Sequence, residues 1–305
     1  MSNKVLGTKG DTGVLINPKY KDSLFRMLFG RDTSESKQNL LDLYNALNGS
    51  HHTDLDNIKL YMLEDVMYIN YKNDVSFIVN NELNLYEHQS SINPNMPLRG
   101  LIYASKEYSK YMKEYNLDAY SSRLIKIPTP KYVVLYNGKA SYPEKTILKL
   151  SDMFIKEDDS GDYEWTATVL NINNGYNSNL KNICAALKDY TDFIELIRYN
   201  QTVLGMDDKH AVNTAIDKTL KKKNSLYKIL SSSRAEVTEM FLCEFDQELH
   251  DKTLLEQGIE QGIDIGKVKK GKEIYLNFLD YGMSIEKIAE ICKTTKEHIE
   301  EIINS

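Results

Sequence analysis

Four residues in the first half of the chain have the types and spacing of a metal site. Asp74 precedes the apolar run Val75–Val79, and Glu87, His88 and Gln89 close the apolar run that follows. Side chains alternate along a strand, so Glu87 and Gln89 should face one side of a sheet and His88 the other. A tight antiparallel hairpin turning near 80–82 would bring the start of its first strand, at Asp74, beside the end of its second, at Glu87.

Two carboxylates that meet at strand ends, beside a main-chain carbonyl, suit a hard divalent cation. Mg²⁺ is usually held by one or two carboxylates, with waters and substrate phosphate in its other positions. Such an ion polarises a phosphoryl oxygen and acidifies a bound water, as phosphodiester hydrolysis requires. The alternative for Asp74 is a turn residue at a strand entrance. A structural role is harder to assign to Glu87, because an unpaired buried carboxylate is costly.

The elements that would position these residues follow from the hydrophobic pattern. Helical spacing predicts a helix from Asp22 to Phe29 and a second from about Ser34 to Asn48. Short β-branched and aromatic runs predict strands near 59–70, 74–79, 83–89 and 131–136, with a long helix between the last two that ends near Leu117. We therefore expect an α/β fold, a mixed sheet flanked by helices, followed by a mainly helical C-terminal half.

In order and spacing, five pieces of the chain resemble the PD-(D/E)XK nuclease superfamily, in particular the recombination-promoting nuclease family, whose members are also described as transposases. The pieces are Asp22-Ser-Leu-Phe-Arg, Asp74-Val-Ser-Phe, Glu87-His-Gln-Ser, Met96-Pro-Leu-Arg-Gly-Leu-Ile-Tyr-Ala and Val133-Val-Leu-Tyr-Asn-Gly. The resemblance covers about residues 20–150 and implies a restriction-endonuclease-like fold.

The resemblance also implies roles for individual residues. Asp74, Glu87 and the main-chain carbonyl of His88 would bind Mg²⁺ (or Mn²⁺ or Ca²⁺). Asp22 matches an upstream acidic position that would hold a metal-bound water or a second ion; its alternative is a helix N-cap. Gln89 stands where the wider superfamily has lysine, so it would orient the attacking water through a hydrogen bond without supplying a charge.

The expected activity is that of a Mg²⁺-dependent endonuclease that hydrolyses DNA phosphodiester bonds with low sequence specificity, in a role linked to recombination or mobile DNA. The alternative is a catalytically inactive protein of nuclease fold that binds DNA or another protein.

Charge is unevenly distributed along the 305 residues, whose formal net charge is -6. Residues 1–150 hold 19 Lys and Arg against 16 Asp and Glu, and residues 151–305 hold 19 against 28. Residues 97–150 are locally basic, ten against four, and rich in tyrosine. This composition suits a surface that faces phosphates and bases, and it is equally typical of a solvated helix face. The acidic half could inhibit the basic half by covering it.

We expect three regions: a nuclease-like domain over 1–175, a helical region over 176–255, and a glycine-repeat helix with a small helical module over 256–305. Gly258, Gly262 and Gly266 recur at a spacing of four, which indicates close helix packing or a flexible joint. Residues 272–303 predict three short helices. Their outline resembles a DNA-reading helix–turn–helix, but the acidic residues of the last helix favour a packing or dimerisation module, and so a homo-oligomer.

Several other classes are excluded or disfavoured by composition. No apolar run approaches the roughly 18 residues of a membrane span, so no membrane association is expected. The first residues lack the apolar stretch of a signal peptide. Three widely spaced cysteines fit neither a disulfide framework nor a zinc site, and indicate the reducing cytoplasm.

Overall fold

A computed structural model describes residues 24–61, 74–158 and 160–304 of the chain. The chain divides into two compact units, residues 1–242 and 243–305. The first unit holds a six-stranded sheet in the order β1-β2-β3-β4-β6-β5. Its strands are β1 Lys59–Leu60, β2 Val75–Val79, β3 Glu82–Gln89, β4 Thr129–Tyr136, β5 Lys145–Lys149 and β6 Thr166–Asn171.

The sheet is mixed. Strands β1, β2 and β3 form an antiparallel meander, β3 and β4 are parallel, β4 and β6 are parallel, and β5 runs antiparallel to β6 at the far edge. The parallel connection from β3 to β4 passes through helix α3, Met96–Glu114. The expected α/β class is therefore confirmed.

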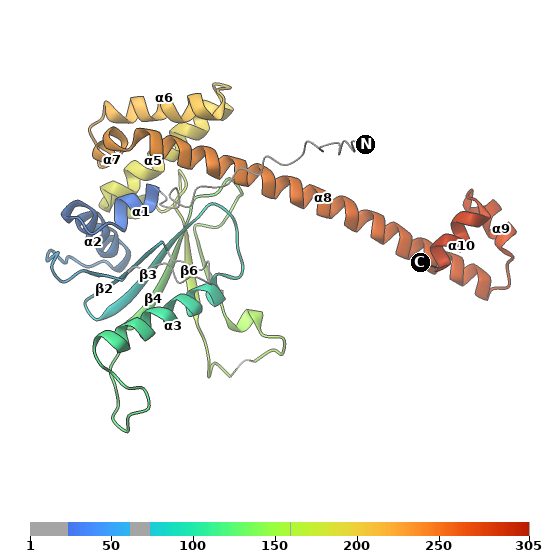
Figure 1. The fold of residues 1–305 in the computed structure, drawn as a ribbon, viewed down its shortest axis with the longest axis horizontal. Coiled ribbons are helices and arrows are strands. Elements are labelled where there is room, and N and C mark those ends of the chain that lie inside the picture. The colour runs from blue at the N-terminus through green and yellow to red at the C-terminus, as the bar shows by residue number, and fades with distance from the viewer. Residues whose placement is uncertain (1–23, 62–73, 159, 305) are drawn as a thin grey trace, which may run out of the picture. The chain divides into compact units, whose positions relative to one another are not determined.

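Helices cover both faces of the sheet (Figure 1). Helix α3 lies on one face, where Met96 and Ala104 pack against Leu85, Val134 and Val169 of the strands. The other face carries α1 Leu24–Phe29, α2 Ser34–Asn48 and α5 Ala185–Thr202. Side chains of even-numbered β3 residues point to this second face and those of odd-numbered residues point to α3, because strand side chains alternate.

The first helices and the hairpin form where the sequence predicts them. Thr33 caps α2 by accepting the N–H of Ser36, and Gly49 ends it in the left-handed region at φ 63°. Asn80 and Asn81 make the two-residue turn between β2 and β3 with φ of 50° and 59°. Asparagine tolerates this conformation better than most residues, which explains why the turn falls there. The expected strand at 59–70 is described only at its start, and its remainder lies outside the described residues.

Strands β5 and β6 are absent from the sequence-based expectation. Strand β6 lies inside the polar, turn-rich stretch 156–179, between β4 and β5, with Ala167, Val169 and Leu170 buried. Its six residues, TATVLN, mix polar and apolar side chains, which is too weak a pattern to predict a strand. Its burial comes from β4 and α3, which are distant in sequence.

Helical residues after the sheet belong to the first unit. Helix α4 Ser178–Ile183 packs with α2 and α5, helix α6 Asp208–Leu220 packs with α5, and helix α7 Tyr227–Ser232 packs with α6. Helix α8, Arg234–Asp280, contributes Val237 and Phe241 to the same core before it leaves the unit. The expected boundary at 175 thus lies inside a single compact unit.

The second unit has a small core of its own. The end of α8, α9 Ile285–Cys292 and α10 Lys296–Asn304 enclose Ile288 and Ile299. The first of the three expected short helices is therefore the end of a 47-residue helix. Ser284 caps α9, and Thr295 caps α10 by accepting the N–H of His298.

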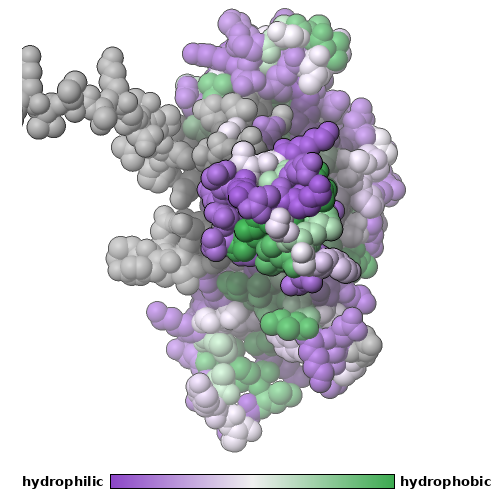
Figure 2. Space-filling view, turned by 90° about the vertical axis from the view of Figure 1, so that its right-hand side faces the viewer, coloured by the Kyte–Doolittle hydropathy of each residue, from purple (hydrophilic) through white to green (hydrophobic). Residues whose placement is uncertain are grey.

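Among the described residues, no helix combines the length and apolarity needed to cross a bilayer. On the face drawn in Figure 2, hydrophilic residues in purple are interspersed with smaller hydrophobic patches in green.

Candidate metal and nuclease site

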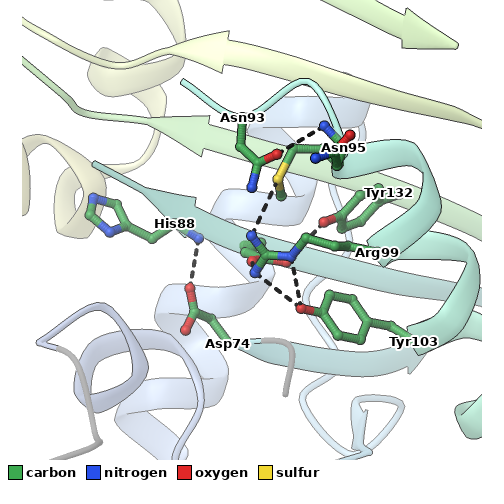
Figure 3. A network of polar contacts seen from close by, with 9 residues as sticks. Asp74, His88, Asn93, Asn95, Arg99, Tyr103 and Tyr132 are labelled. Atoms are coloured by element: carbon green, nitrogen blue, oxygen red, sulfur yellow. Dashed lines mark hydrogen bonds and ion pairs between the residues drawn. The ribbon is translucent and has the colours of Figure 1, made fainter. Parts of the chain in front are cut away.

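The hairpin of β2 and β3 brings Asp74 beside Glu87. Val75 pairs with Tyr86 across the two strands, so the next position outward sets Asp74 level with Glu87. Oδ2 of Asp74 accepts the main-chain N–H of His88 at 2.7 Å, as Figure 3 shows. This hydrogen bond fixes the Asp74 carboxylate at the end of β3. The two acids therefore lie close together, as the hairpin predicts.

Glu87 is buried between the sheet and α3, with 3% of its surface exposed. Its Oε1 accepts from Nη2 of Arg99 on α3, and its Oε2 accepts from the hydroxyl of Tyr132 on β4 at 2.8 Å. The hydroxyl of Tyr103 accepts from Nε and Nη2 of Arg99 at 3.2 and 3.1 Å. Figure 3 shows Arg99, Tyr103 and Tyr132 converging on one place beside Asp74.

Burial dominates the electrostatics of both acids. It raises the pKa of Asp74 to about 6, against the His88 N–H and the charges of Arg26 and Arg99, which lower it. Burial raises the pKa of Glu87 to about 7; Arg99 opposes this rise and the nearby charge of Asp74 adds to it. The charge of Asp74 therefore acts on Glu87. Arg99 partly neutralises both acids, and Arg26 partly neutralises Asp74. A divalent cation would relieve the same repulsion.

His88 and Gln89 extend to opposite faces, as the alternation predicts. The His88 ring stacks on Phe25 of α1 and its Nε2 lies 3.0 Å from the hydroxyl of Tyr190 on α5. Burial lowers the pKa of His88 to about 4, with the charge of Arg198 acting in the same direction. Its imidazole is thus neutral at neutral pH and points away from Glu87. Only the main chain of His88 lies at the acids.

Gln89 ends β3 on the side of Glu87 and is partly exposed. Its main-chain oxygen accepts the N–H of Asn137 at 2.9 Å, which ties the end of β3 to the end of β4. Within the part of the chain that the structure describes, no contact of its amide side chain fixes a role, so the water-orienting role of Gln89 and the ligand role of the His88 carbonyl remain predictions.

The described residues bring two of the three predicted acids together. Asp22 lies outside the described residues, and the described part holds no cluster of three or more His, Cys, Asp or Glu side chains able to bind a metal ion. Two carboxylates nevertheless fit the common Mg²⁺ arrangement, in which waters and substrate phosphate complete the coordination. The acids fit an ion of this kind, although both Glu87 oxygens already have donors.

Sequence reasoning missed Arg99 and Tyr132. Both stood inside or beside pieces that we singled out, Arg99 in the segment after Met96 and Tyr132 at the start of the strand 131–136. Strand alternation could have indicated the orientation of Tyr132, since it shares a strand face with Val134 and Tyr136. Nothing local indicated Arg99, because its contact with Glu87 depends on where α3 crosses the sheet.

A cavity of about 320 Å³ lies elsewhere in the first unit, against α5, and shares no residue with the Asp74–Glu87 pair. Its lining mixes acids such as Asp189 and Asp192 with Lys181, whose Nζ donates to the main-chain oxygen of Asn173 at 2.7 Å. These groups are engaged with protein partners, so we base no function on this cavity.

Comparison with protein-family models, with curated proteins and with solved structures gave no match for this chain.

Proposed function

We propose that this protein is a divalent-metal-dependent DNA endonuclease of low sequence specificity. The observation that carries the proposal is the pairing of Asp74 and Glu87 at the ends of adjacent strands, in surroundings that raise the pKa of each. Perturbed acids that converge at strand ends are typical of functional sites. A Mg²⁺, Mn²⁺ or Ca²⁺ ion is the cofactor that this chemistry favours.

In the proposed mechanism the two acids would hold the ion, and the hydrogen bond from the His88 N–H keeps the Asp74 carboxylate in place. The bound ion would polarise the phosphoryl oxygen and acidify a water. Gln89, on the Glu87 side of β3, would orient a water for in-line attack. On the resemblance alone, Asp22 and the His88 carbonyl would supply further oxygens.

The chain order of the elements supports a restriction-endonuclease-like fold. An antiparallel meander of β1, β2 and β3 leads into α3 and then into β4, which lies parallel to β3. The acids stand on β3 and at the start of β2, beside that crossover. The proposed link to recombination or mobile DNA comes from the motif resemblance.

DNA is the proposed partner of the first unit. Several basic residues of the segment 97–150 are exposed, including Arg123, Lys126, Lys145 and Lys149. The Tyr120 side chain, in the loop after α3, is 98% exposed. Cations with an exposed aromatic ring provide phosphate contacts and a surface on which bases can stack.

The direct test is nicking of a supercoiled plasmid by the full chain with Mg²⁺ or Mn²⁺, with and without a chelator. Loss of a residue that contacts a metal ligand, without binding the metal itself, costs about 10–100-fold in activity. Glu87→Gln should lower the cleavage rate by more than this. Glu107→Gln is the matched control. Glu107 is also a buried glutamate whose pKa burial raises to about 7, but it lies beside Ser76, farther along α3. Equal activity of wild type and Glu87→Gln would rule out the catalytic assignment.

The second candidate is a non-enzymatic protein that keeps the nuclease fold and binds DNA or another protein. It is favoured by the full engagement of the Glu87 carboxylate with Arg99 and Tyr132, which is what a structural ion pair needs. Calorimetric titration with Mn²⁺ separates the two functions. A scaffold protein has no need of a carboxylate site that binds the ion.

We further propose that the second unit mediates self-association. Within the described part of α8, the side chains of Leu255, Ile259 and Ile263 are 64, 54 and 53% exposed, at a spacing of four that places them on one helix face. An exposed apolar stripe on a helix is typical of a surface that packs against a second helix.

A further inference from the structure

The Glu87 carboxylate is held on both of its oxygens. Arg99 donates to Oε1 and Tyr132 to Oε2. Each oxygen keeps a second lone pair, but a guanidinium in contact opposes a cation beside the same carboxylate. A divalent ion would therefore bind Glu87 most favourably in the place of one donor. The question is which donor can leave.

Arg99 is the donor that can leave. Its side chain is 26% exposed, against 4% for Glu87, so the guanidinium lies on the solvent side of the pair. Tyr132 is buried in β4, where its ring packs against those of Tyr103 and Trp165. An ion that approaches from solvent therefore meets Arg99 before Glu87.

The same arginine opposes a cation electrostatically at both acids. The charge of Arg99 lowers the pKa of Glu87 and of Asp74, which means that it stabilises their ionised forms. A divalent ion would provide this stabilisation itself, and two cations beside the same carboxylate repel each other. Arg99 and the ion are thus competitors.

A displaced Arg99 would stay at the site. Tyr103 accepts hydrogen bonds from its Nε and Nη2, and Sδ of Met96 lies 3.6 Å from Nη1. These contacts do not involve Glu87. A guanidinium held there presents several donors in a planar fork, which suits a phosphate group.

We propose that Arg99 is an exchangeable counter-ion of the Asp74–Glu87 site, an inference that rests on the proposed function. In the metal-free protein it neutralises Glu87. Binding of a divalent cation displaces it, and the released guanidinium, retained by Tyr103, binds the DNA phosphate at the same site. Arg99 then supplies the positive charge that Gln89 lacks.

The test compares Mn²⁺ affinity, measured by calorimetry well above the pKa of about 7 of Glu87, with the rate of plasmid nicking at saturating Mn²⁺. Arg99→Met should bind Mn²⁺ at least about tenfold more tightly, because a close cation has been removed, and should cleave at least about tenfold more slowly. A purely structural arginine would lower both quantities. Lys113→Met, which removes a positive charge from an exposed position of α3, is the matched control and should change neither.

A second variant keeps the test decisive if Arg99→Met folds poorly. Tyr103→Phe preserves every charge and removes only the acceptor that holds the guanidinium. It should raise the Michaelis constant for DNA by at least about tenfold, as expected for the loss of a hydrogen bond to a charged group, without weakening Mn²⁺ binding.

Each outcome separates this inference from the proposed function. If Arg99→Met binds Mn²⁺ no more tightly than wild type while Glu87→Gln loses binding, Arg99 does not compete with the ion; the inference is then overturned and the function stands. A wild-type protein that neither binds Mn²⁺ nor cleaves DNA would overturn both.

Discussion

Asp74 and Glu87 differ in how their charges are compensated. Glu87 has an arginine in direct contact, whereas Asp74 has a main-chain N–H and only the more distant charges of Arg26 and Arg99. A single neutral donor compensates a carboxylate less than a guanidinium does. In the metal-free protein the negative charge of Asp74 is therefore poorly compensated, and this lowers the stability of the folded state by a measurable amount.

Removing that charge should stabilise the metal-free protein at high pH. The pKa of Asp74 rises from 3.8 to about 6 on folding, so its favourable contribution is full below pH 3.8 and is lost as the pH rises through about 6. Asp74→Asn keeps an oxygen for the His88 N–H. We expect its free energy of unfolding to exceed that of wild type by about 1–2 kcal/mol above pH 7, after allowance for the partial exposure of Asp74, and to match it near pH 4. Urea unfolding across this pH range, with a chelator present, measures the difference.

Asp118→Asn is the control for this measurement. Asp118 is exposed and also accepts a main-chain N–H, from Tyr120 at 2.9 Å. Because Asp118 is exposed, its replacement should leave the free energy of unfolding close to that of wild type. If Asp74→Asn changed the free energy of unfolding by the same amount at every pH, the charge of Asp74 would not be what destabilises the folded protein.

The residues of the site were predictable as far as local geometry reaches. Strand alternation and a two-residue turn were enough to place Asp74 beside Glu87 and to send the His88 ring to the other face. Arg99 and Tyr132 were not predictable in this way, since they reach Glu87 from elements 12 and 45 residues away. Their positions depend on tertiary packing.

At the scale of elements, the site depends on how closely α3 approaches β4. A Cβ atom added at Gly100 would overlap the ring of Tyr132, whose hydroxyl holds Glu87. The glycine is therefore needed for close approach, although it weakens the helix that contains it. The neighbouring Arg99 reaches Glu87 because of this approach.

Gly100→Ala should destabilise the protein by about 1–3 kcal/mol, because overpacking outweighs the gain of up to about 1 kcal/mol in helix propensity. It should also lower nicking activity, since Tyr132 and Arg99 both move relative to Glu87. Gly271→Ala provides the contrast: Gly271 lies in α8 with ordinary contact distances of 3.8 and 3.9 Å around an added Cβ. That variant should be more stable by about 1 kcal/mol. Thermal unfolding of both variants tests the argument, and a stabilised Gly100→Ala would contradict it.

The sequence predicted those helices and strands whose start, periodicity and end are all marked by residues close together in the chain. Helix α2 has a capping threonine, a periodic apolar face and a terminal glycine, and the structure shows the expected bounds, Ser34–Asn48. Strands β5 and β6 have no such signals. β5 alternates between exposed and half-buried residues at the sheet edge, and β6 is a short strand of mixed polar and apolar residues that is placed between β4 and β5 by tertiary pairing.

At the scale of the whole molecule, α8 joins two units with different surroundings. Its first residues are buried in the core of the first unit, with Phe241 against Phe193 at 5.8 Å between ring centroids, and its last turns enclose the core of the second. Between these ends the helix exposes Leu255, Ile259 and Ile263. An added Cβ at Gly258, Gly262 or Gly266 would meet nothing within 4 Å. Among the described residues, no side chain covers the glycines, which leaves room for a second chain.

The charges along this part of α8 indicate how a second copy would bind. Residues 244–264 hold seven acidic residues and one basic residue, whereas residues 265–272 hold four lysines and no acid. Two copies side by side in parallel would set like charges together. An antiparallel pair would set the acidic part of each helix against the lysines of the other, with the apolar stripe between them.

We therefore expect self-association that weakens as salt increases, and a charge swap should control it. Replacing Lys267, Lys269 and Lys270 by Glu gives the segment a net negative charge, and replacing Glu256, Glu260 and Asp264 by Lys gives it a net positive charge. Each variant alone should dimerise at least about tenfold more weakly than wild type, because each exposed ion pair contributes about 0.2–1 kcal/mol. An equal mixture should restore the dimer, because both contacts of the antiparallel pair are then attractive. Sedimentation of the separate and mixed proteins measures this, and a mixture that stays monomeric while wild type dimerises would exclude the antiparallel arrangement. Association of wild type that strengthens with salt would instead point to a parallel pair, in which screening relieves repulsion between like charges.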